Sequence, residues 1–328
     1  MHATDTTLQL PWVEKYRPQK LAQVVGQRDI TSRLESYVST RNLPNMMFAG
    51  PAGIGKTTSA VALAKELFGS DFERNFLELN ASDDRGIDVV RNTIKEFART
   101  LAFNADFKII FLDESDALTA DAQQALRRTM EKYTKTCRFV LSCNYSSRII
   151  EPIQSRCVVF RFKPLQSKDL EAQLKHIAEQ EKLSVDAKAY EALIYVSEGD
   201  LRKAVNTLQA CAALEKKITD DTVYSVANRA KPKEIKALLE KSFEGKFMEA
   251  RTQLDALMNE HGLSGEDIIA QLHRELLEWP ENEVDSKTKI MLVDKIGEYD
   301  FRMVEGANER IQLEALIANI ALLNAAKK

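Results

Sequence analysis

Hydrophobic positions in the first half of the chain gather in short apolar runs, which are separated by longer stretches of helical periodicity. A single short run fits either a strand or a buried helix, but five runs with regular helical spacers favour strands. Strands that alternate with helices predict an α/β fold, in which helices cover both faces of a parallel sheet. The predicted strands are Met46–Ala49, Phe76–Asn80, Lys108–Leu112, Arg138–Cys143 and Cys157–Phe162, and the accompanying helices are Asp29–Thr40, Ser59–Phe68, Ile87–Thr100 and Thr119–Tyr133.

Strand patterns end near Pro164, and the rest of the chain shows helical periodicity alone. Lys231-Pro232-Lys233 interrupts this pattern and predicts a hinge, because proline removes a backbone donor and disfavours helix at the preceding residue. We therefore expect three domains, at 1–164, 165–230 and 231–328, the last of them all-α. The predicted helices are Lys168–Lys182, Asp186–Ser197, Asp200–Leu214 and Asp220–Asn228, followed by roughly 233–243, 246–260, 265–278, 284–299 and 308–325.

The last predicted helix carries a wide apolar stripe. Such a stripe is either part of the core of a helical bundle or a contact with another subunit, and the pattern leaves both alternatives open. Its residues are Ile311, Leu313, Leu316, Ile317, Ile320 and Leu323.

Composition narrows the class of protein. With 328 residues, of which 44% are hydrophobic and 29% charged, the chain is typical of a globular protein with two or three domains. Its net charge of −3 means that any contact with nucleic acid needs a local basic patch. There is no apolar run of about 18 residues and no signal core in residues 1–11, so we expect an intracellular protein without a membrane partner. The cysteines Cys137, Cys143, Cys157 and Cys211 lack C-x-x-C spacing and are interpreted as small apolar residues of a reduced protein.

The motif G-x-x-x-x-G-K-[ST] follows the first predicted strand, within Gly50-Pro51-Ala52-Gly53-Ile54-Gly55-Lys56-Thr57-Thr58. Glycines let backbone amides turn inward around a polyphosphate, and Lys56 places a positive charge on its β and γ oxygens. Thr57 offers a hydroxyl to Mg²⁺, and the helix that begins near Gly55 directs the positive end of its dipole at the phosphates. With a strand before it and a helix after it, this segment predicts a nucleoside-triphosphate site.

The third predicted strand is followed by two acidic residues, Asp113 and Glu114. Asp113 would hold the Mg²⁺ shell at the edge of the sheet. Glu114 would orient and polarise the attacking water, since phosphoryl transfer depends on positioning and charge stabilisation. The alternative is a pair of acids that caps a strand. The gap to Lys56 fits an intervening strand and helix, which favours an ATPase.

Three further polar residues stand next to predicted elements. Asn144 follows the next strand, where it either reaches the γ-phosphate and the water or serves as a turn residue. Arg156 precedes the last strand. It is either solvated or an arginine finger, which acts on the γ-phosphate of a neighbouring subunit and is worth about 10³–10⁵ in rate. Arg202, on a helix of the second domain, could report the nucleotide state to that domain.

Two other segments indicate ligand contacts. Trp12–Pro18, with the sequence WVEKYRP, is dense in aromatic and charged residues, and it either packs on a nucleotide base or closes a domain as a latch. Arg91, Lys95 and Arg99 recur at the i, i+4, i+8 spacing that shares one face of an α-helix. This basic stripe either tracks a DNA backbone without sequence preference or is a solvated helix face.

These motifs, in this order, resemble those of the AAA+ ATPases, and most closely those of the replication factor C small subunits of clamp loaders, in their archaeal form. The resemblance is carried by WVEKYRP, the phosphate loop, LNASDDRGID, FLDESDAL, LSCNY, IQSRC and GDLRKAVN. It covers about residues 12–230, and the helical tail is similar in length and character. Ala52 and Ile54 replace the family's usual Pro and Thr, and Ser115 replaces its usual Ala. Nucleotide binding should survive these departures, which leave the turnover rate open.

The resemblance implies a AAA+ core, a helical lid over 165–230 and a helical collar over 231–328 that holds a pentameric ring. It implies ATP and Mg²⁺ as ligands, and ATP-dependent loading of a sliding clamp onto primer–template DNA in replication. The expected partners are the clamp-loader large subunit, other small subunits, the sliding clamp and primer–template DNA. The expected location is the cytoplasm and nucleoid of a prokaryote, or the nucleus of a eukaryote.

The resemblance also implies a role for each matching residue. Catalysis involves Lys56, Glu114, Asn144 as sensor 1, Arg202 as sensor 2, and Arg156 as a finger acting in trans on the adjacent subunit. Mg²⁺ is held by Thr57 and Asp113. The nucleotide is bound by Gly50–Thr58, Asn144 and Arg202, with Val13, Arg17 and Val25 on the adenine side. DNA is contacted by Arg85, Arg91, Lys95 and Arg99.

Two other functions fit part of the pattern. Another DNA-acting AAA+ ATPase, such as a branch-migration helicase or a replication initiator, would share the nucleotide motifs. An initiator normally adds a winged-helix module, and the tail lacks the short β-hairpin pattern of such a module. A structural ring subunit would bind nucleotide without hydrolysing it, and intact Lys56, Glu114 and Arg156 argue against this alternative.

Overall fold

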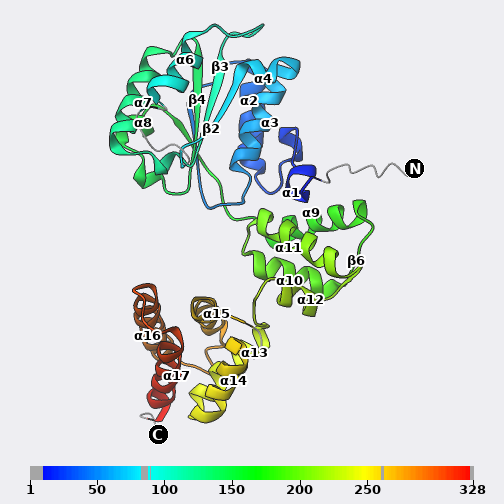
Figure 1. Cartoon of the computed structure of the whole chain (residues 1–328), viewed down its shortest axis with the longest axis vertical. Coiled ribbons are helices and arrows are strands. Elements are labelled where there is room, and N and C mark those ends of the chain that lie inside the picture. The colour runs from blue at the N-terminus through cyan, green and yellow to red at the C-terminus, as the bar shows by residue number, and fades with distance from the viewer. Residues whose placement is uncertain (1–9, 83–87, 89, 260–261, 326–328) are drawn as a thin grey trace, which may run out of the picture. The chain divides into compact units, whose positions relative to one another are not determined.

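The computed structural model describes residues 10–82, 88, 90–259 and 262–325. Its contacts divide the chain into two compact units, residues 1–217 and residues 218–328 (Figure 1). The amino-terminal unit contains the five-stranded sheet and the helices around it, and the described elements of the carboxyl-terminal unit after Thr219 are helices. No helix within the described ranges is long and apolar enough to cross a membrane.

Five parallel strands form the sheet of the amino-terminal unit, in the order β2-β3-β4-β1-β5. They are β1 (Met46–Ala49), β2 (Phe76–Asn80), β3 (Lys108–Asp113), β4 (Cys137–Cys143) and β5 (Val158–Arg161). The ends of each strand differ from the predicted ends by one residue at most. All neighbouring strands are parallel, which confirms the predicted α/β fold.

Helices cover both faces of this sheet, because alternate side chains of each strand point to opposite faces. One apolar cluster packs against α2 (Arg28–Thr40) and α3 (Lys56–Phe68), and the other packs against α7 (Ala120–Lys132) (Figure 1). Burial on both faces explains why the strands are continuous apolar runs rather than alternating ones. The first cluster takes Met46, Phe48, Ile109, Phe111, Val140 and Phe160 from the strands, and the second takes Met47, Ala49, Ile110, Leu112, Phe139 and Leu141.

The carboxyl ends of three adjacent strands meet at one edge of the sheet. β4 lies between β1 and β3, with Ala49 opposite Cys143 and Leu112 opposite Leu141. The backbone N–H of Gly50 donates to the carbonyl oxygen of Cys143 at 3.2 Å, so the phosphate loop begins beside the end of β4. The predicted placement of Asn144 next to the strand of Asp113 is therefore confirmed.

Part of the helix predicted at Ile87–Thr100 has a different form. Val90–Ile94 make a π-helical turn, η3, and Lys95–Arg99 make the α-helix α6. Hydrogen bonds from i to i+5 insert an extra residue into a turn, so the spacing from Arg91 to Lys95 is no longer one α-helical step. The expectation of an uninterrupted α-helix is wrong here, because apolar spacing does not distinguish a single π turn from an α turn.

Short helical segments connect the larger elements of the amino-terminal unit. They include four-residue helices and single 3₁₀ turns, and several of them border the ends of the strands. They are α1 (Trp12–Lys15), η1 (Leu21–Gln23), η2 (Gly69–Asp71), α4 (Phe72–Asn75), η4 (Ser115–Ala117), η5 (Ser146–Arg148) and α8 (Glu151–Gln154).

Three helices complete the amino-terminal unit after the sheet: α9 (Ser167–Gln180), α10 (Ala187–Ser197) and α11 (Leu201–Leu214). Gly199, at φ +87°, separates α10 from α11. The expectation of no strands after Pro164 is wrong, since β6 (Ser184–Val185) pairs with β7 (Lys217–Ile218). Two-residue strands are too short to show periodicity in the sequence.

The cysteines lie in or beside the apolar interior. Cys137, Cys143 and Cys211 are buried and Cys157 is partly buried, which agrees with their interpretation as small apolar residues. Burial raises the pKa of Cys143 to about 11 and that of Cys157 to about 12. These thiols are therefore protonated at neutral pH, and a thiol is a far weaker nucleophile than a thiolate.

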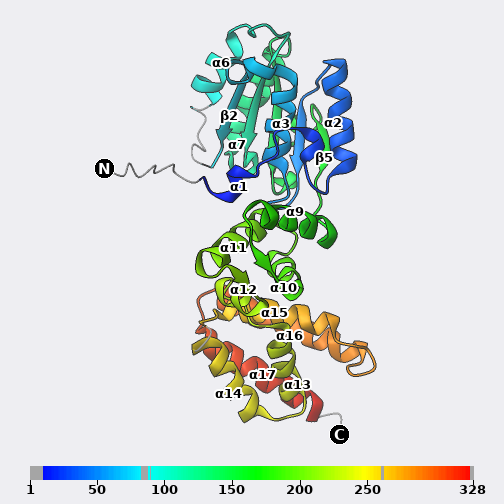
Figure 2. The same cartoon turned by 90° about the vertical axis from the view of Figure 1, so that its right-hand side faces the viewer.

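The helices from α13 onward, drawn in Figure 2, share one apolar core in the carboxyl-terminal unit. Ser264 caps the start of α15, because its hydroxyl accepts the backbone N–H of Asp267 at 3.1 Å. On α17 the residues Leu313, Leu316, Ile317 and Ile320 are buried in this core, which favours the bundle-core alternative for most of the stripe. The helices of this unit are α12 (Asp220–Val226), α13 (Pro232–Phe243), α14 (Phe247–Asn259), α15 (Gly265–Glu278), α16 (Ser286–Val304) and α17 (Glu309–Ala325).

Two isoleucines of α17 provide a matched test of this core. Ile317 is 1% exposed and Ile311 is 63% exposed. We expect Ile317→Ala to lower the free energy of unfolding by about 2–5 kcal/mol, because it leaves a cavity. Ile311→Ala should change it by about 0.5 kcal/mol or less. Denaturant unfolding of the full chain measures both, and equal losses would contradict the assignment of the stripe to the core.

Candidate nucleotide-binding and catalytic site

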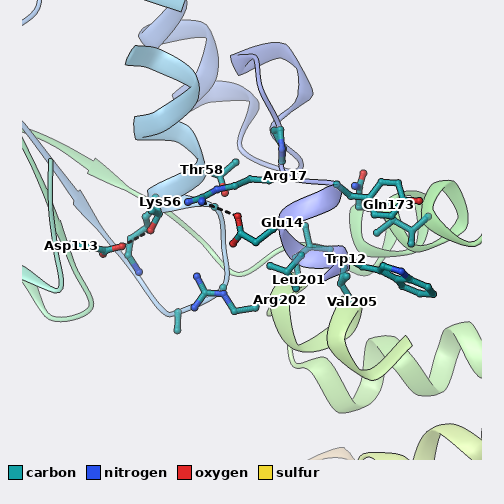
Figure 3. Close-up of a pocket in the computed structure, with 18 of the residues that line it drawn as sticks. Trp12, Glu14, Arg17, Lys56, Thr58, Asp113, Gln173, Leu201, Arg202 and Val205 are labelled. Atoms are coloured by element: carbon teal, nitrogen blue, oxygen red, sulfur yellow. Dashed lines mark hydrogen bonds and ion pairs between the residues drawn. The ribbon is translucent and has the colours of Figure 1, made fainter. Parts of the chain in front are cut away.

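A pocket that is open to solvent lies in the amino-terminal unit. Its walls come from α1, the loop between β1 and α3, the ends of β3 and β4, and the helices α9 and α11. Figure 3 shows Arg202 reaching into it from α11, with Glu14 and Arg17 entering from the amino-terminal segment.

The phosphate loop borders this pocket and leads directly into α3. Gly55, at φ +96°, is the residue before the helix, and Lys56 begins it, so the amino terminus of α3 faces the loop. A Cβ on Gly50 would lie 2.5 Å from the carbonyl oxygen of Phe162, which leaves no room for a side chain. The loop residues that line the pocket are Ala52, Gly53, Gly55, Lys56, Thr57 and Thr58, whereas Gly50, Pro51 and Ile54 do not line it.

Lys56 is 8% exposed and joins the loop to the end of β4. Its Nζ donates to the carbonyl oxygens of Gly50 and Pro51 at 2.7 and 2.6 Å, and to Asn144 Oδ1 at 3.0 Å. Burial lowers the pKa of Lys56, and the nearby Asp113 opposes this effect. These contacts bring together two predicted catalytic residues, Lys56 and Asn144.

Thr57 and Asp113 meet at the predicted metal position. Thr57 Oγ1 donates to Asp113 Oδ2 at 2.6 Å, and Asp113 Oδ1 accepts the backbone N–H of Glu114 at 2.9 Å (Figure 3). A hydroxyl and a carboxylate are hard oxygen donors of the kind that Mg²⁺ prefers, usually together with phosphate oxygens and water. The donor set therefore fits Mg²⁺ bound with a nucleoside triphosphate.

Glu114 lines the pocket with an unusual backbone conformation. It has φ +50° and ψ 38°, in the left-handed region that residues other than glycine seldom adopt. Such strain is often found at functional sites, where the surrounding structure maintains it. Ser115, the departure from the family pattern, donates its hydroxyl to the carbonyl oxygen of Leu112 at 2.8 Å, and so bonds to the backbone of β3.

Asp116 is a functional candidate that sequence reasoning missed. Its two carboxylate oxygens accept the backbone N–H groups of Asn144 at 3.3 Å and of Tyr145 at 3.1 Å. It therefore holds the end of β4, and with it the side chain that contacts Lys56. The signal in the sequence was its position three residues after Asp113, in DESD.

The lid helix α11 contacts the phosphate loop directly. The backbone N–H of Leu201 donates to the carbonyl oxygen of Gly53 at 3.1 Å. Asp200 caps α11 by accepting the backbone N–H of Lys203 at 2.9 Å. A Cβ on Gly53 would lie 1.7 Å from Asp200 Oδ1, so only glycine allows this approach. Arg202 follows immediately and lines the pocket.

The amino-terminal segment forms another wall of the pocket, next to α11. Val13 and Arg17 line the pocket as expected, together with Trp12, Glu14 and Tyr16, whose place in the wall sequence reasoning did not single out. Arg17 Nη1 donates to Glu14 Oε2 at 3.2 Å. Val25 does not line the pocket. Its neighbour Val24 is buried and approaches Gly55, with Cγ1 3.7 Å from the position of a Cβ there.

Arg156 does not line the pocket of its own chain. Its Nη2 lies 2.7 Å from Glu131 Oε1 of α7, and its Nη1 donates to the carbonyl oxygen of Pro152 at 2.6 Å. Its side chain is 39% exposed, so part of the guanidinium group is accessible to solvent. This position does not favour an action of Arg156 on the nucleotide of its own chain.

The contact of Arg85, Arg91, Lys95 and Arg99 with DNA remains a prediction. Arg85 lies outside the described residues, and Arg91 lies in the π-helical turn. Lys95 and Arg99 lie on α6, half-buried and exposed respectively, while Ile94 and Ala98 are buried in the core of the unit. Of Lys95 and Arg99, whose exposure the structure describes, Arg99 is the more accessible to solvent.

Three family models match the chain in succession. The one described as "ATPase family associated with various cellular activities (AAA)" matches residues 46–165. The one described as "RCF1/5-like, AAA+ ATPase lid domain" matches residues 172–213, and "Replication factor C C-terminal domain" matches residues 230–319. The sheet, the lid helices and the carboxyl-terminal helices are thus matched separately.

Curated proteins named replication factor C small subunit are similar to this chain over nearly its whole length. That of Methanococcus vannielii is 57% identical, over 96% of this chain and 100% of the relative. That of Archaeoglobus fulgidus is 56% identical, over 95% of this chain and 97% of the relative. That of Methanothermobacter thermautotrophicus is 56% identical, over 94% and 96% respectively.

A solved structure of the RuvB Holliday junction branch migration motor of Thermotoga maritima is also similar. The TM-score is 0.55, over 80% of this chain and 91% of that chain. At 19% identity, this similarity shows the fold alone.

The contact between Gly53 and Asp200 generates a prediction. Gly53→Ala should weaken ATP binding about tenfold, because overpacking costs about 1–3 kcal/mol and the methyl group would push α11 from the loop. Gly69→Ala is the matched control, since Gly69 also has a positive φ, of +54°, but nothing lies within 4 Å of its Cβ position. Titration with a fluorescent ATP analogue measures both. Equal affinities in the two variants would contradict the close approach of the lid.

Proposed function

The chain belongs to the replication factor C small-subunit family of AAA+ ATPases, and from this premise we propose that it loads a sliding clamp onto primer–template DNA in a ring of subunits. The observation that carries the proposal is the pocket in which Lys56, Thr57, Asp113, Glu114, Asn144 and Arg202 gather between the sheet and the lid. Similarity over nearly the whole chain to proteins of this name supports it.

Each residue of the pocket has a task that its position supports. The amides of the phosphate loop and Lys56 bind the triphosphate, and Thr57 and Asp113 hold Mg²⁺, which neutralises charge on the phosphates when bound. Glu114 orients water, and Asn144 senses the γ-phosphate beside Lys56. On the adenine side we retain Val13 and Arg17 as contacts. Neither Val25 nor Val24 lines the pocket, although Val24 approaches Gly55, so neither is retained.

The lid and the neighbouring subunit supply the remaining parts. Arg202 carries the nucleotide state to the lid, because α11 begins on the phosphate loop. Arg156 acts in trans: it is absent from the pocket of its own chain and partly exposed, so an adjacent subunit can present its nucleotide to it. We propose the division into core 1–164, lid 165–230 and collar 231–328, with the large subunit and other small subunits in a pentamer.

ATP binding would assemble a ring that opens the clamp and grips primer–template DNA, and hydrolysis would release the closed clamp. Arg99 and Lys95 on α6 are the described candidates for contact with the DNA backbone. Such contacts read duplex shape and charge rather than sequence. In a prokaryotic cell the protein would act in the cytoplasm, at the nucleoid.

Steady-state ATP hydrolysis tests this function, with the purified chain measured alone and with its large subunit. We expect strong stimulation only when primed DNA and a sliding clamp are present together. Glu114→Gln should lower this turnover about 10²-fold or more, since it removes the group that acts on water. Stimulation by a four-way junction, or by DNA regardless of clamp and primer, would indicate a different motor. Unaltered turnover in Glu114→Gln would indicate a structural subunit.

Action of Arg156 across subunits has a separate test. Arg156→Ala should lower stimulated turnover about 10³-fold or more, and Lys56→Ala should abolish it. Mixed rings of the two variants should regain activity, because an intact site of one chain then meets the intact arginine of the other. Glu131→Gln, which keeps Arg156 but removes its ion-pair partner, is the control and should stay active. No recovery in mixed rings would place Arg156 outside the reaction.

A further inference from the structure

The short helix α1 is bound to the lid by three polar contacts. Glu181, the residue that ends α9, accepts from Lys15 Nζ at 2.7 Å and from Tyr16 Oη at 2.6 Å, both on its Oε1. On the other side of α1, the backbone N–H of Trp12 donates to Gln209 Oε1 of α11 at 3.0 Å. Residues 12–16 are therefore held by both lid helices that line the pocket.

The residues that follow α1 are bound to the core instead. Gln19 accepts a hydrogen bond from Lys65 of α3, and the backbone N–H of Leu21 donates to Glu66 Oε1 of the same helix at 2.7 Å. Leu21 is fully buried in the cluster beside α3. The chain thus passes from the lid to the core across residues 17–19, and Arg17 and Pro18, in this link, line the pocket.

Glu181 occupies a position that its own helix disfavours. A carboxylate at the carboxyl terminus of a helix lies at the negative end of the helix dipole, which costs a few tenths of a kcal/mol or more. The hydrogen bonds from Lys15 and Tyr16 offset this cost, and they hold the pKa of Glu181 below its ordinary value. The side chain of Glu181 is 19% exposed, so it is partly shielded from water, whereas that of Lys15 is 50% exposed. Glu181 therefore has a partner in α1 rather than in its own helix.

We propose that Glu181 is a positioning residue that straps α1 to the lid, so that α1 and the lid close on the nucleotide as one body. The inference rests on the proposed nucleotide site and deepens it. In this proposal residues 17–19 are the link that bends when the lid moves. Arg17, in this link, then changes its position relative to the bound nucleotide. The strap and the contact of Leu201 with Gly53 then hold the lid from two sides of the pocket.

Loss of the strap should lower affinity without touching the reacting groups. We expect Glu181→Ala to raise the KM for ATP and the Kd about tenfold, as for loss of hydrogen bonds to a charged group, with kcat unchanged within about twofold. Tyr16→Phe should have a smaller effect, because it removes only one of the two hydrogen bonds to Glu181. The double variant should be no worse than Glu181→Ala, because Glu181→Ala already removes the hydrogen bond of Tyr16. Glu179→Ala is the matched control, since it removes an exposed carboxylate from the last turn of the same helix.

Trp12 offers a readout that does not depend on turnover. The chain has two tryptophans, so in a Trp279→Phe background the emission of Trp12 reports on α1. Addition of ATP should shift this emission in the parent chain and in Glu179→Ala, and the shift should be lost at equal ATP occupancy in Glu181→Ala. A Glu181→Ala chain that matches its control in KM and in emission would overturn the strap. A parent chain that fails to bind ATP would instead overturn the proposed function.

Discussion

The order of the parallel strands is the constraint on which the site depends. β4 lies between β1 and β3, so three motifs that are far apart in the sequence leave the sheet at one edge. Only this order lets Lys56 reach Asn144 while its neighbour Thr57 reaches Asp113. The order is stabilised by apolar clusters on both faces, and a register shift of one residue would turn each strand's buried side chains to the opposite face.

The other half of the pocket is attached by a different kind of contact. Where the sheet depends on two large apolar clusters, α11 meets the phosphate loop through the carbonyl oxygen of Gly53, and α1 meets the lid through Glu181 and Gln209. Individual hydrogen bonds contribute about 0.5–1.5 kcal/mol each. The contact of Leu201 with Gly53 can break and form again more easily than a packed core can, while the contacts of α1 keep it with the lid. The pocket therefore combines a rigid floor with walls that can move.

Local sequence predicted much of this arrangement. The strands follow from their apolar runs, because burial on both faces of a parallel sheet demands them. The phosphate loop, Asp113 and Glu114 were found because their chemistry needs particular residues within a few positions of a strand end. The π-helical turn before α6 was missed, and so were the two-residue strands β6 and β7, since such short features leave no periodic trace.

The sequence by itself determined the set of helices and strands, the residues of the phosphate loop, and the acidic pair Asp113 and Glu114. Each of these depends on neighbours only a few residues away. Tertiary structure decided which distant groups meet. Lys15 and Glu181 are 166 positions apart, and Asp116 holds an amide 28 positions later. Val24 approaches Gly55 of the loop, and Arg156 does not line the pocket of its own chain. The physical reason is that such contacts depend on packing of whole elements, for which no short stretch of sequence carries a pattern.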